Sequence, residues 1–410
     1  MMNRIIFFSI LLLIIDLLAF QAVRHLVSSS GKSLRTIVYI AYWLIPAITV
    51  AYLVGFSTGW SEYLPKGMQV MVRTMIFIFY FAKLLIAVLI LVDDIRRVVF
   101  GALNMGFKDL DLSTRRSDWM SYSALLLGVI PIVSLTYGMA RNPYRYKLHK
   151  SVVPVKGLHP ELHGLKIVQI SDIHSGSFLY TEPVERSIKM INAEKPDIVF
   201  FTGDLVNAMA EEMEPFVEMF SKIEAPLGVY SILGNHDYGD YHNWPTKQAK
   251  EQNFEQLKSV HQRLGWTLLL NEHRRIQLKD TFFNVIGVEN YSASPRFPKY
   301  GDLPLAIKGM DKDTFNVLLS HDPSHWDDQV TKNHPEINLT LSGHTHGFQF
   351  GVEIPGWIRW SPIQYVYPQW AGLYENASQY LYVNRGLGYL GYPGRVGILP
   401  EITLLTLEAS

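Results

Sequence analysis

Four long apolar runs in the first third of the chain restrict its fold more than any other feature of the sequence. An α-helix needs about 20 mainly apolar residues to cross the hydrocarbon core of a bilayer. Four segments approach that length: 5–26, 37–56, 70–92 and 120–137. We therefore expect residues 1–140 to form a bundle of four transmembrane helices, which makes the lipid bilayer the first partner of this chain.

Two features of these runs leave alternatives open. The first run could be a secretory signal segment, but no small-residue cleavage site follows Phe20, and three further apolar runs come after it. Three ionisable residues lie within the runs, Asp16, Arg73 and Lys83. Such residues can mark a transport path, so a transporter or sensor with a regulatory metal-binding domain is one alternative. In the simpler interpretation, Arg73 reaches the interface, while Asp16 and Lys83 neutralise each other inside the bundle.

Basic residues in the connecting segments predict the orientation of the bundle, because cytoplasmic loops usually carry more of them. The first and third connections are richer in Lys and Arg than the opposite side, with Lys108, Arg115 and Arg116 in the third connection. This pattern predicts a multi-pass protein of the cell membrane whose carboxy-terminal domain is extracytoplasmic. The basic residue Arg4 near the amino terminus favours the opposite orientation.

The rest of the chain has a different character. Residues 141–163 are basic and interrupted by prolines, so we expect a linker, and residues 164–410 alternate apolar runs with helix-compatible stretches in the manner of an α/β domain. Lys and Arg total 37, as do Asp and Glu, and there is no cysteine. Nucleic acid is therefore not an expected partner, and thiolate ligands are excluded. A helix is expected over 183–193, and buried strands over 165–170, 197–202, 228–233, 282–288, 316–319 and 337–341.

Polar motifs follow five of these strands, where open α/β sheets usually bind their ligands. The motifs are Asp172-Ile173-His174, Gly203-Asp204, Gly234-Asn235-His236-Asp237, Ser320-His321 and Gly343-His344-Thr345-His346. Each motif alone is weak, since one histidine after a strand is usually structural. Together they supply oxygen and nitrogen donors from separate loops, which is what a dinuclear metal centre requires.

In this order, the motifs resemble the signature of the calcineurin-like metallophosphoesterase superfamily, from about Gly164 onwards. The segments Tyr382–Gly388 and Pro400–Ile402 are similar to a bacterial subgroup with amino-terminal membrane segments, related to the Bacillus membrane-associated phosphoesterase and to enzymes that cleave UDP-2,3-diacylglucosamine. The resemblance implies a metallophosphoesterase-type α/β/β/α sandwich after the transmembrane bundle. In one departure, Phe348 replaces a glycine common in the family and could narrow the cleft beside Gln349.

The resemblance also implies a ligand set and an activity. One metal ion would be held by Asp172, His174 and His346. A second would be held by Asn235, His321 and His344, with Asp204 bridging both. Manganese is the expected metal, with iron or zinc as alternatives, and the pair would activate water for in-line attack on phosphorus. His236 would protonate the leaving oxygen, and Asp237 would orient His236.

Two further features bear on the substrate. Trp and Tyr side chains crowd residues 351–374, which favours a membrane interface, a lipid or sugar face, or a loop packed on its own domain. Arg385 is a candidate phosphate contact, with a structural ion pair as the alternative. We expect hydrolysis of a phosphoester or pyrophosphate bond in an amphiphilic substrate, such as a nucleotide-sugar lipid, although that lipid would require a cytoplasmic catalytic domain. A cell-envelope binding module without turnover is disfavoured, because His236 and Asp237 are both present.

Overall fold

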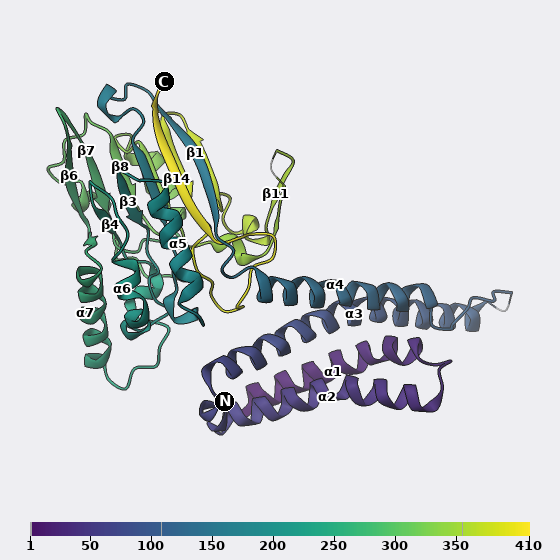
Figure 1. Ribbon diagram of the computed structural model, residues 1–410. Coiled ribbons are helices and arrows are strands. Elements are labelled where there is room, and N and C mark those ends of the chain that lie inside the picture. Colours follow the sequence, from purple (N-terminus) through teal and green to yellow (C-terminus); the bar gives the residue numbers. More distant parts are fainter. Residues whose placement is uncertain (1, 108, 355) are drawn as a thin grey trace. The chain divides into compact units, whose positions relative to one another are not determined.

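The computed structural model describes residues 2–107, 109–354 and 356–410 (Figure 1). Met1, where the expected transmembrane domain starts, and Lys108, used above to predict orientation, lie outside the described residues. The chain divides into a helical unit that extends to Tyr137 and a carboxy-terminal unit, Gly138–Ser410.

The four apolar runs form four helices, α1 (Met2–Leu26), α2 (Lys32–Ser57), α3 (Lys66–Gly106) and α4 (Asp118–Arg141). Each contains a stretch long and apolar enough to cross a membrane. Large apolar side chains on these helices are exposed, with Ile37 at 64% and Leu126 at 66%. Apolar side chains on the outside of a helix bundle are expected when the surroundings are lipid rather than water.

Helix α3 extends well past the apolar run that predicts it. Its 41 residues span about 60 Å at the usual helical rise, against about 30 Å for the hydrocarbon core. Beyond the apolar run, Arg96 pairs with Asp93 and Arg97 with Asp94, each three residues apart on the helix. Arg116, from the connection to α4, reaches both aspartates. These ion pairs stabilise the helical turns in which charged residues interrupt the apolar run.

A buried ion pair connects three of the helices. The Lys83 Nζ of α3 lies 2.6 Å from the Asp16 Oδ1 of α1, and the Tyr80 hydroxyl donates to the other carboxylate oxygen at 2.8 Å. The Tyr42 hydroxyl of α2 donates to the Asp16 carbonyl, and the Lys83 ammonium lies 4.4 Å from the centre of the Tyr42 ring. The prediction that Asp16 and Lys83 neutralise each other is confirmed, and the pair connects α1 to α3.

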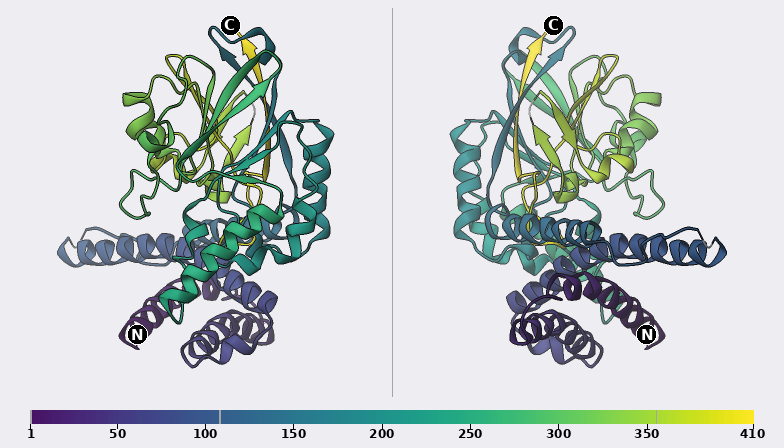
Figure 2. Two further views of the ribbon diagram at one scale, coloured as in Figure 1. Left: turned by 90° about the vertical axis from the view of Figure 1, so that its left-hand side faces the viewer. Right: turned by 90° about the vertical axis from the view of Figure 1, so that its right-hand side faces the viewer.

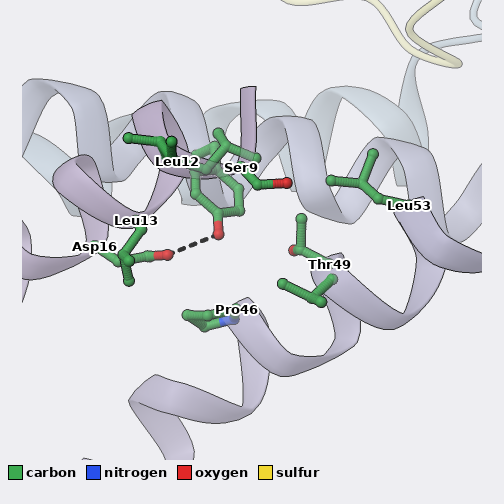
Figure 3. Close-up of a pocket in the computed structure, with 10 residues that line it drawn as sticks. Ser9, Leu12, Leu13, Asp16, Pro46, Thr49 and Leu53 are labelled. Carbon is green, nitrogen blue, oxygen red and sulfur yellow. Dashed lines mark hydrogen bonds between the residues drawn. The ribbon is translucent and has the colours of Figure 1, made fainter. Parts of the chain in front are cut away.

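An apolar cavity of about 340 Å³ adjoins this pair (Figure 3). Its wall includes Leu12, Pro46 and Leu53, while Asp16 is at one edge and bonded to the Tyr80 hydroxyl. Arg73 lies in the second turn of α3, where its guanidinium donates to Gln69 at 2.8 Å and is exposed. This position near a helix end agrees with the prediction for Arg73.

The carboxy-terminal unit contains two six-stranded sheets (Figure 1). The first has the order β1 (Lys147–Val155), β14 (Glu401–Ala409), β2 (Lys166–Ile170), β3 (Ile198–Phe201), β4 (Val229–Ser231) and β5 (Thr267–Leu268). The second has the order β12 (Gly372–Asn376), β13 (Gln379–Val383), β9 (Leu339–Ser342), β8 (Asn316–Leu319), β7 (Thr281–Gly287) and β6 (Glu272–Leu278). A separate hairpin consists of β10 (Val352–Ile354) and β11 (Ile358–Trp360).

The two sheets face each other, and short helices cover their outer sides (Figure 2). Ile167 and Phe200 of the first sheet share an apolar core with Phe283 and Val317 of the second. The outer face of the first sheet packs against α5 (Glu182–Ala193), α6 (Val217–Phe220) and α7 (Lys247–Arg263). The outer face of the second packs near α8 (Leu303–Ala306) and α9 (Thr331–Asn333). The predicted α/β/β/α sandwich behind four apolar helices is therefore confirmed.

Each strand expected from a buried apolar run coincides with β2, β3, β4, β7, β8 or β9, and the expected helix coincides with α5. The expected linker 141–163 differs, because it contains β1. This strand pairs in parallel with β14 along its whole length, and its Val153 and Val155 side chains enter the core between the sheets. Basic residues and Pro154 hide the strand in the sequence, and its partner lies far away in the chain.

Candidate metal centre

The five motifs occupy the loops that leave the carboxyl ends of β2, β3, β4, β8 and β9. Five non-glycine residues of the motifs have left-handed backbone conformations: Asp172 (φ 50), His174 (φ 47), Asp204 (φ 61), His344 (φ 69) and His346 (φ 50). For a residue other than glycine this conformation costs about 1 kcal/mol or more. The chain accepts this cost five times where polar side chains converge, which is typical of a functional site rather than of ordinary turns.

The first group of donors comes from β2 and β9. Asp172 and His174 are fully buried, and His346 is 7% exposed. His174 Nε2 lies 3.0 Å from His346 Nε2, which in turn lies 3.3 Å from Asp172 Oδ1. Ligand atoms from all three residues fall within 4.8 Å of one another. Two imidazole nitrogens and a carboxylate oxygen that face one another form a donor set that suits a divalent cation.

The second group continues directly from the first. Asp204 Oδ2 lies 3.5 Å from His174 Nε2 and 3.2 Å from His321 Nε2, so it stands between the two groups. His344 Nδ1 lies 3.3 Å from His321 Nε2 and 2.9 Å from Asn235 Oδ1. Contacts of 3.5 Å or less thus connect all seven side chains that the sequence nominated as ligands.

The charges in this cluster are strongly coupled. Burial, reinforced by the Asp204 charge, raises the pKa of Asp172 to about 6. Burial also acts to raise the pKa of Asp204, but the imidazoles of His321, His236 and His174 outweigh it and hold that pKa well below its usual range. Burial opposes a charge on His321, yet Asp204 raises its pKa to about 10. A bound cation would neutralise the two buried carboxylates directly, so the donor chemistry fits a metal ion.

Several residues outside the motifs orient the proposed ligands. His321 Nδ1 donates to the Thr202 carbonyl at 2.7 Å, which leaves Nε2 free to face Asp204. The Tyr367 hydroxyl donates to Asp322 Oδ2 at 3.2 Å and lies 2.9 Å from His344 Nε2. Sequence reasoning did not nominate Tyr367 or Asp322, although Asp322 directly follows His321 and Tyr367 lies in the aromatic stretch. Partners of this kind fix the direction of a metal-binding imidazole.

His236 lies beside the cluster, but Asp237 does not orient it as expected. The His236 Nδ1 donates to the Asn207 carbonyl at 2.7 Å, and its ring packs on Tyr241 with centroids 4.2 Å apart. Asp237 instead accepts bonds from the backbone amides of Asp204, Leu205 and Gly234 at 2.8–2.9 Å. The expected pairing is corrected because these amides, which follow neighbouring strands, occupy both carboxylate oxygens.

Arg385 is also placed differently from the phosphate contact considered above. Its guanidinium donates to Glu401 and to Glu353, both at 2.6 Å, and the residue is 2% exposed. Arg385 therefore forms a structural ion pair, the alternative considered above, because the two glutamates already neutralise its charge inside the domain. Phe348 is 58% exposed, whereas the neighbouring Gln349 is buried and its side-chain amide donates to the Tyr392 carbonyl at 2.9 Å.

Comparison with known proteins agrees with this geometry. Residues 165–348 match the family of calcineurin-like phosphoesterases, and residues 2–143 match the family described as a probable calcineurin-like phosphoesterase transmembrane domain. A transmembrane protein with metallophosphoesterase domain from Danio rerio is 30% identical over 323 residues, which cover 76% of this chain and 69% of the relative. A protein of the same description from Bos taurus is 32% identical over 264 residues, or 63% of this chain and 56% of the relative. The uncharacterized metallophosphoesterase YkuE of Bacillus subtilis is 30% identical over 278 residues, or 67% of this chain and 90% of the relative.

The chain therefore belongs to the calcineurin-like metallophosphoesterases. Within that family it is a membrane-anchored member, with an amino-terminal domain of four membrane-spanning helices and a buried Asp/His cluster suited to metal binding.

Proposed function

We propose that this chain is a two-metal phosphohydrolase of the membrane that cleaves a phosphoester or pyrophosphate bond in an amphiphilic substrate. The observation that carries the proposal is the convergence of seven donor side chains from five loops at contacts of 3.5 Å or less. Its ligands are Asp172, His174 and His346 for one ion, and Asn235, His321 and His344 for the other, with Asp204 shared between them.

Two divalent cations at this site would supply an activated water and neutralise charge on the phosphoryl oxygens. The protein's part is to hold their ligands in fixed directions. The Thr202 carbonyl holds His321, and the Tyr367 hydroxyl contacts His344. Manganese is the proposed metal, with iron or zinc as alternatives that the same mixed oxygen and nitrogen donors accept.

His236 is the proposed proton donor to the leaving oxygen. Its Nδ1 must carry a hydrogen, because the Asn207 carbonyl at 2.7 Å can only accept. This bond leaves Nε2 free to hold or release a proton. The side chain is half-buried beside His174, with ring centroids 4.9 Å apart. A group in this position can reach a phosphate held at the ligand cluster without itself being a ligand.

The substrate proposal follows from the anchor as well as from the cluster. A hydrolase fixed in a membrane meets lipid substrates at high local concentration, which supports an amphiphilic phosphoester or a nucleotide-sugar lipid and a role in lipid metabolism. In this division of labour, residues 1–140 anchor the chain and residues 164–410 carry out the chemistry. The intervening residues 141–163 join the two and contribute β1.

The basic residues of the first and third connections support an extracytoplasmic catalytic domain. A reporter fused after Ser410 tests this orientation. An extracytoplasmic signal is expected, and cytoplasmic reporter activity would contradict it. A cytoplasmic result would also restore a nucleotide-sugar lipid as the favoured substrate, since such molecules are cytoplasmic.

The proposal is tested by comparing three variants of the purified full chain, reconstituted with manganese. His236→Ala is expected to lose about 10²- to 10⁴-fold in turnover while its metal content stays nearly unchanged. Asp204→Asn is expected to lose both turnover and metal. His242→Ala is the matched control, because His242 is exposed and packs on Trp244 in the same loop. Loss of metal in His236→Ala would reassign that residue to a structural role.

The substrate class is tested with paired panels of monoesters, diesters and UDP-linked lipids. Preferential cleavage of a lipid substrate, absent in Asp204→Asn, is the expected result. If the metal-loaded protein hydrolyses none of these, the binding-module interpretation replaces the enzyme.

A further inference from the structure

The hairpin formed by β10 and β11 exposes its apolar side chains, whereas its charged side chains bond to the domain. A segment surrounded by water normally has the opposite arrangement. In the register of the hairpin, Glu353 pairs across the strands with Arg359, while Val352 faces Trp360 and Ile354 faces Ile358. Side chains alternate between the two faces of a strand, so the charged pair shares one face and the apolar pairs share the other. Figure 1 shows the hairpin standing apart from the two sheets.

Both charged residues of the hairpin bond to the rest of the domain. Glu353 is bonded to Arg385 at 2.6 Å, and its side chain is 15% exposed. Arg359 donates to the Ala371 carbonyl at 2.8 Å, and its guanidinium lies 5.8 Å from the centre of the Trp370 ring. These contacts anchor the hairpin through its polar residues, so the apolar face is left outside.

The exposed apolar residues of the hairpin and of the nearby segments at 348 and 365–366 are called the apolar hairpin surface; Trp360 Nε1 of the hairpin lies 3.5 Å from the Tyr365 hydroxyl. Its members, with their exposed fractions, are Phe348 (58%), Val352 (44%), Ile354 (43%), Trp357 (82%), Ile358 (41%), Tyr365 (77%) and Val366 (68%). Soluble monomers rarely expose so many large apolar side chains together, and a two-stranded hairpin alone is marginally stable in water. This surface therefore requires an apolar partner.

We propose that the apolar hairpin surface inserts into the interfacial region of the bilayer that holds the four helices. The composition fits, because Trp and Tyr favour the level of the lipid headgroups, where a ring is buried and a polar tip stays hydrated. The connection fits as well. Only residues 142–146 separate α4 from β1, and such a segment spans about 18 Å at most. So short a connection keeps the membrane within reach of the carboxy-terminal unit.

The apolar hairpin surface also leads directly to the metal cluster. Phe348 follows the ligand candidate His346 by two residues. At the other end, Tyr365 and Val366 precede Tyr367, whose hydroxyl lies 2.9 Å from His344 Nε2. The segments that carry the apolar hairpin surface therefore also carry a proposed ligand and a residue that contacts one.

The proposal can be tested cleanly because the chain has no cysteine. Trp357→Cys in the full chain is labelled with an environment-sensitive fluorophore, reconstituted into phosphatidylcholine nanodiscs, and quenched with spin-labelled lipid in the absence of substrate. Asp280→Cys is the matched control, since Asp280 is exposed in the turn between β6 and β7. Val366→Cys provides a second probe of the same surface in case the first variant fails to fold.

Lipid quenching of at least twofold at residues 357 and 366, with little at residue 280, is the expected result. Absence of quenching at 357 and 366 would overturn the proposal and assign the surface to a protein partner. Equal quenching at all three positions would also overturn it, because contact would then not be specific to the hairpin. These measurements need no hydrolysis, so they succeed or fail independently of the proposed enzymatic activity.

Discussion

The two units of the protein each bury a group of ionisable residues, but the groups are built in opposite ways. In the helical unit, the Asp16 carboxylate meets the Lys83 ammonium at 2.6 Å and a tyrosine hydroxyl at 2.8 Å. In the carboxy-terminal unit, Asp172 and Asp204 meet imidazole nitrogens at 3.2–3.5 Å. The first group is neutralised by its own permanent cation, whereas the second presents donors of the kind that bind metal ions. Burial of charge alone therefore does not distinguish a structural ion pair from a catalytic site, while the identity of the partners does.

The largest effect is expected from removing the Asp204 carboxylate, which is proposed to bridge both metal ions. In Asp204→Asn, hydrolysis should fall to background, and manganese should no longer raise the thermal unfolding temperature. Saturation at 100 times the dissociation constant adds about 2.7 kcal/mol to the stability of a protein that binds. Phosphate release and thermal unfolding with and without manganese provide the measurement. Retention of the manganese-induced shift would show that the cluster does not depend on Asp204.

The next largest effect is expected from breaking the buried Asp16–Lys83 ion pair of the helical unit. Lys83→Met leaves the Asp16 carboxylate buried without its cation, which costs about 3–5 kcal/mol. The double variant Asp16→Leu, Lys83→Met should recover most of this loss, because apolar replacement of a buried pair is often nearly neutral. Thermal unfolding measures both, while hydrolysis of a soluble substrate should stay unchanged. Loss of function without loss of stability would instead favour the transporter or sensor interpretation.

The buried Arg385–Glu401 ion pair of the carboxy-terminal unit is also expected to stabilise the fold. Burial opposes ionisation of Glu401, but Arg385 and His149 hold its pKa at about 2, below the ordinary 4.5. A lowered pKa adds stability above pH 4.5, and this contribution is lost as the pH falls through about 2.

Glu401→Gln should therefore lower stability at pH 7 by about 3 kcal/mol, and its unfolding temperature should fall less steeply than that of the natural protein between pH 4.5 and 2. Thermal unfolding across this range measures the difference. An altered KM at unchanged stability would return Arg385 to the substrate site.

The smallest effect is expected at Phe348, which belongs to neither charged group. Its φ of 57° favours glycine, so Phe348→Gly relieves backbone strain and loses little packing from an exposed ring. Relief of backbone strain stabilises the folded state, whereas the greater flexibility of glycine stabilises the unfolded chain. Because these two effects nearly cancel, the free energy of unfolding should change by no more than about 1 kcal/mol. Hydrolysis of soluble substrates should also be unchanged. A large loss of stability would mean that the ring packs more closely than its exposure indicates.

Much of the fold could be predicted because the relevant signals are local. Long apolar runs mark α1 to α4, and short runs of Val, Ile and Phe mark central strands that are buried on both faces. The extension of α3 was not predicted, since the charged residues Asp93, Asp94, Arg96 and Arg97 interrupt its apolar run. Strands β1, β6 and β12 were missed because their exposed faces interrupt the apolar pattern. Strands β13 and β14 were missed as well, although both are largely buried.

The same distinction between local and long-range signals applies to the candidate site. The proposed ligands could be nominated because each follows a predicted strand, and strand ends gather at one edge of a sheet. The bonding of individual side chains could not, because Asp237 and Arg385 find partners that are distant in the chain or belong to the backbone. Asp237 is next to His236 in the sequence, yet its oxygens accept from amides of the β3 loop.

The position of β14 between β1 and β2 has a consequence for synthesis. When the ribosome has just completed β1, about 250 residues remain before its neighbour emerges, which takes on the order of ten seconds or more. Until β14 is made, the facing edges of β1 and β2 have unpaired backbone groups. Such edges favour aggregation unless chaperones or other parts of the chain cover them. A chain interrupted before Glu401 lacks β14 and cannot complete the first sheet, so the sandwich that holds the ligand loops is assembled only after β14 has been made.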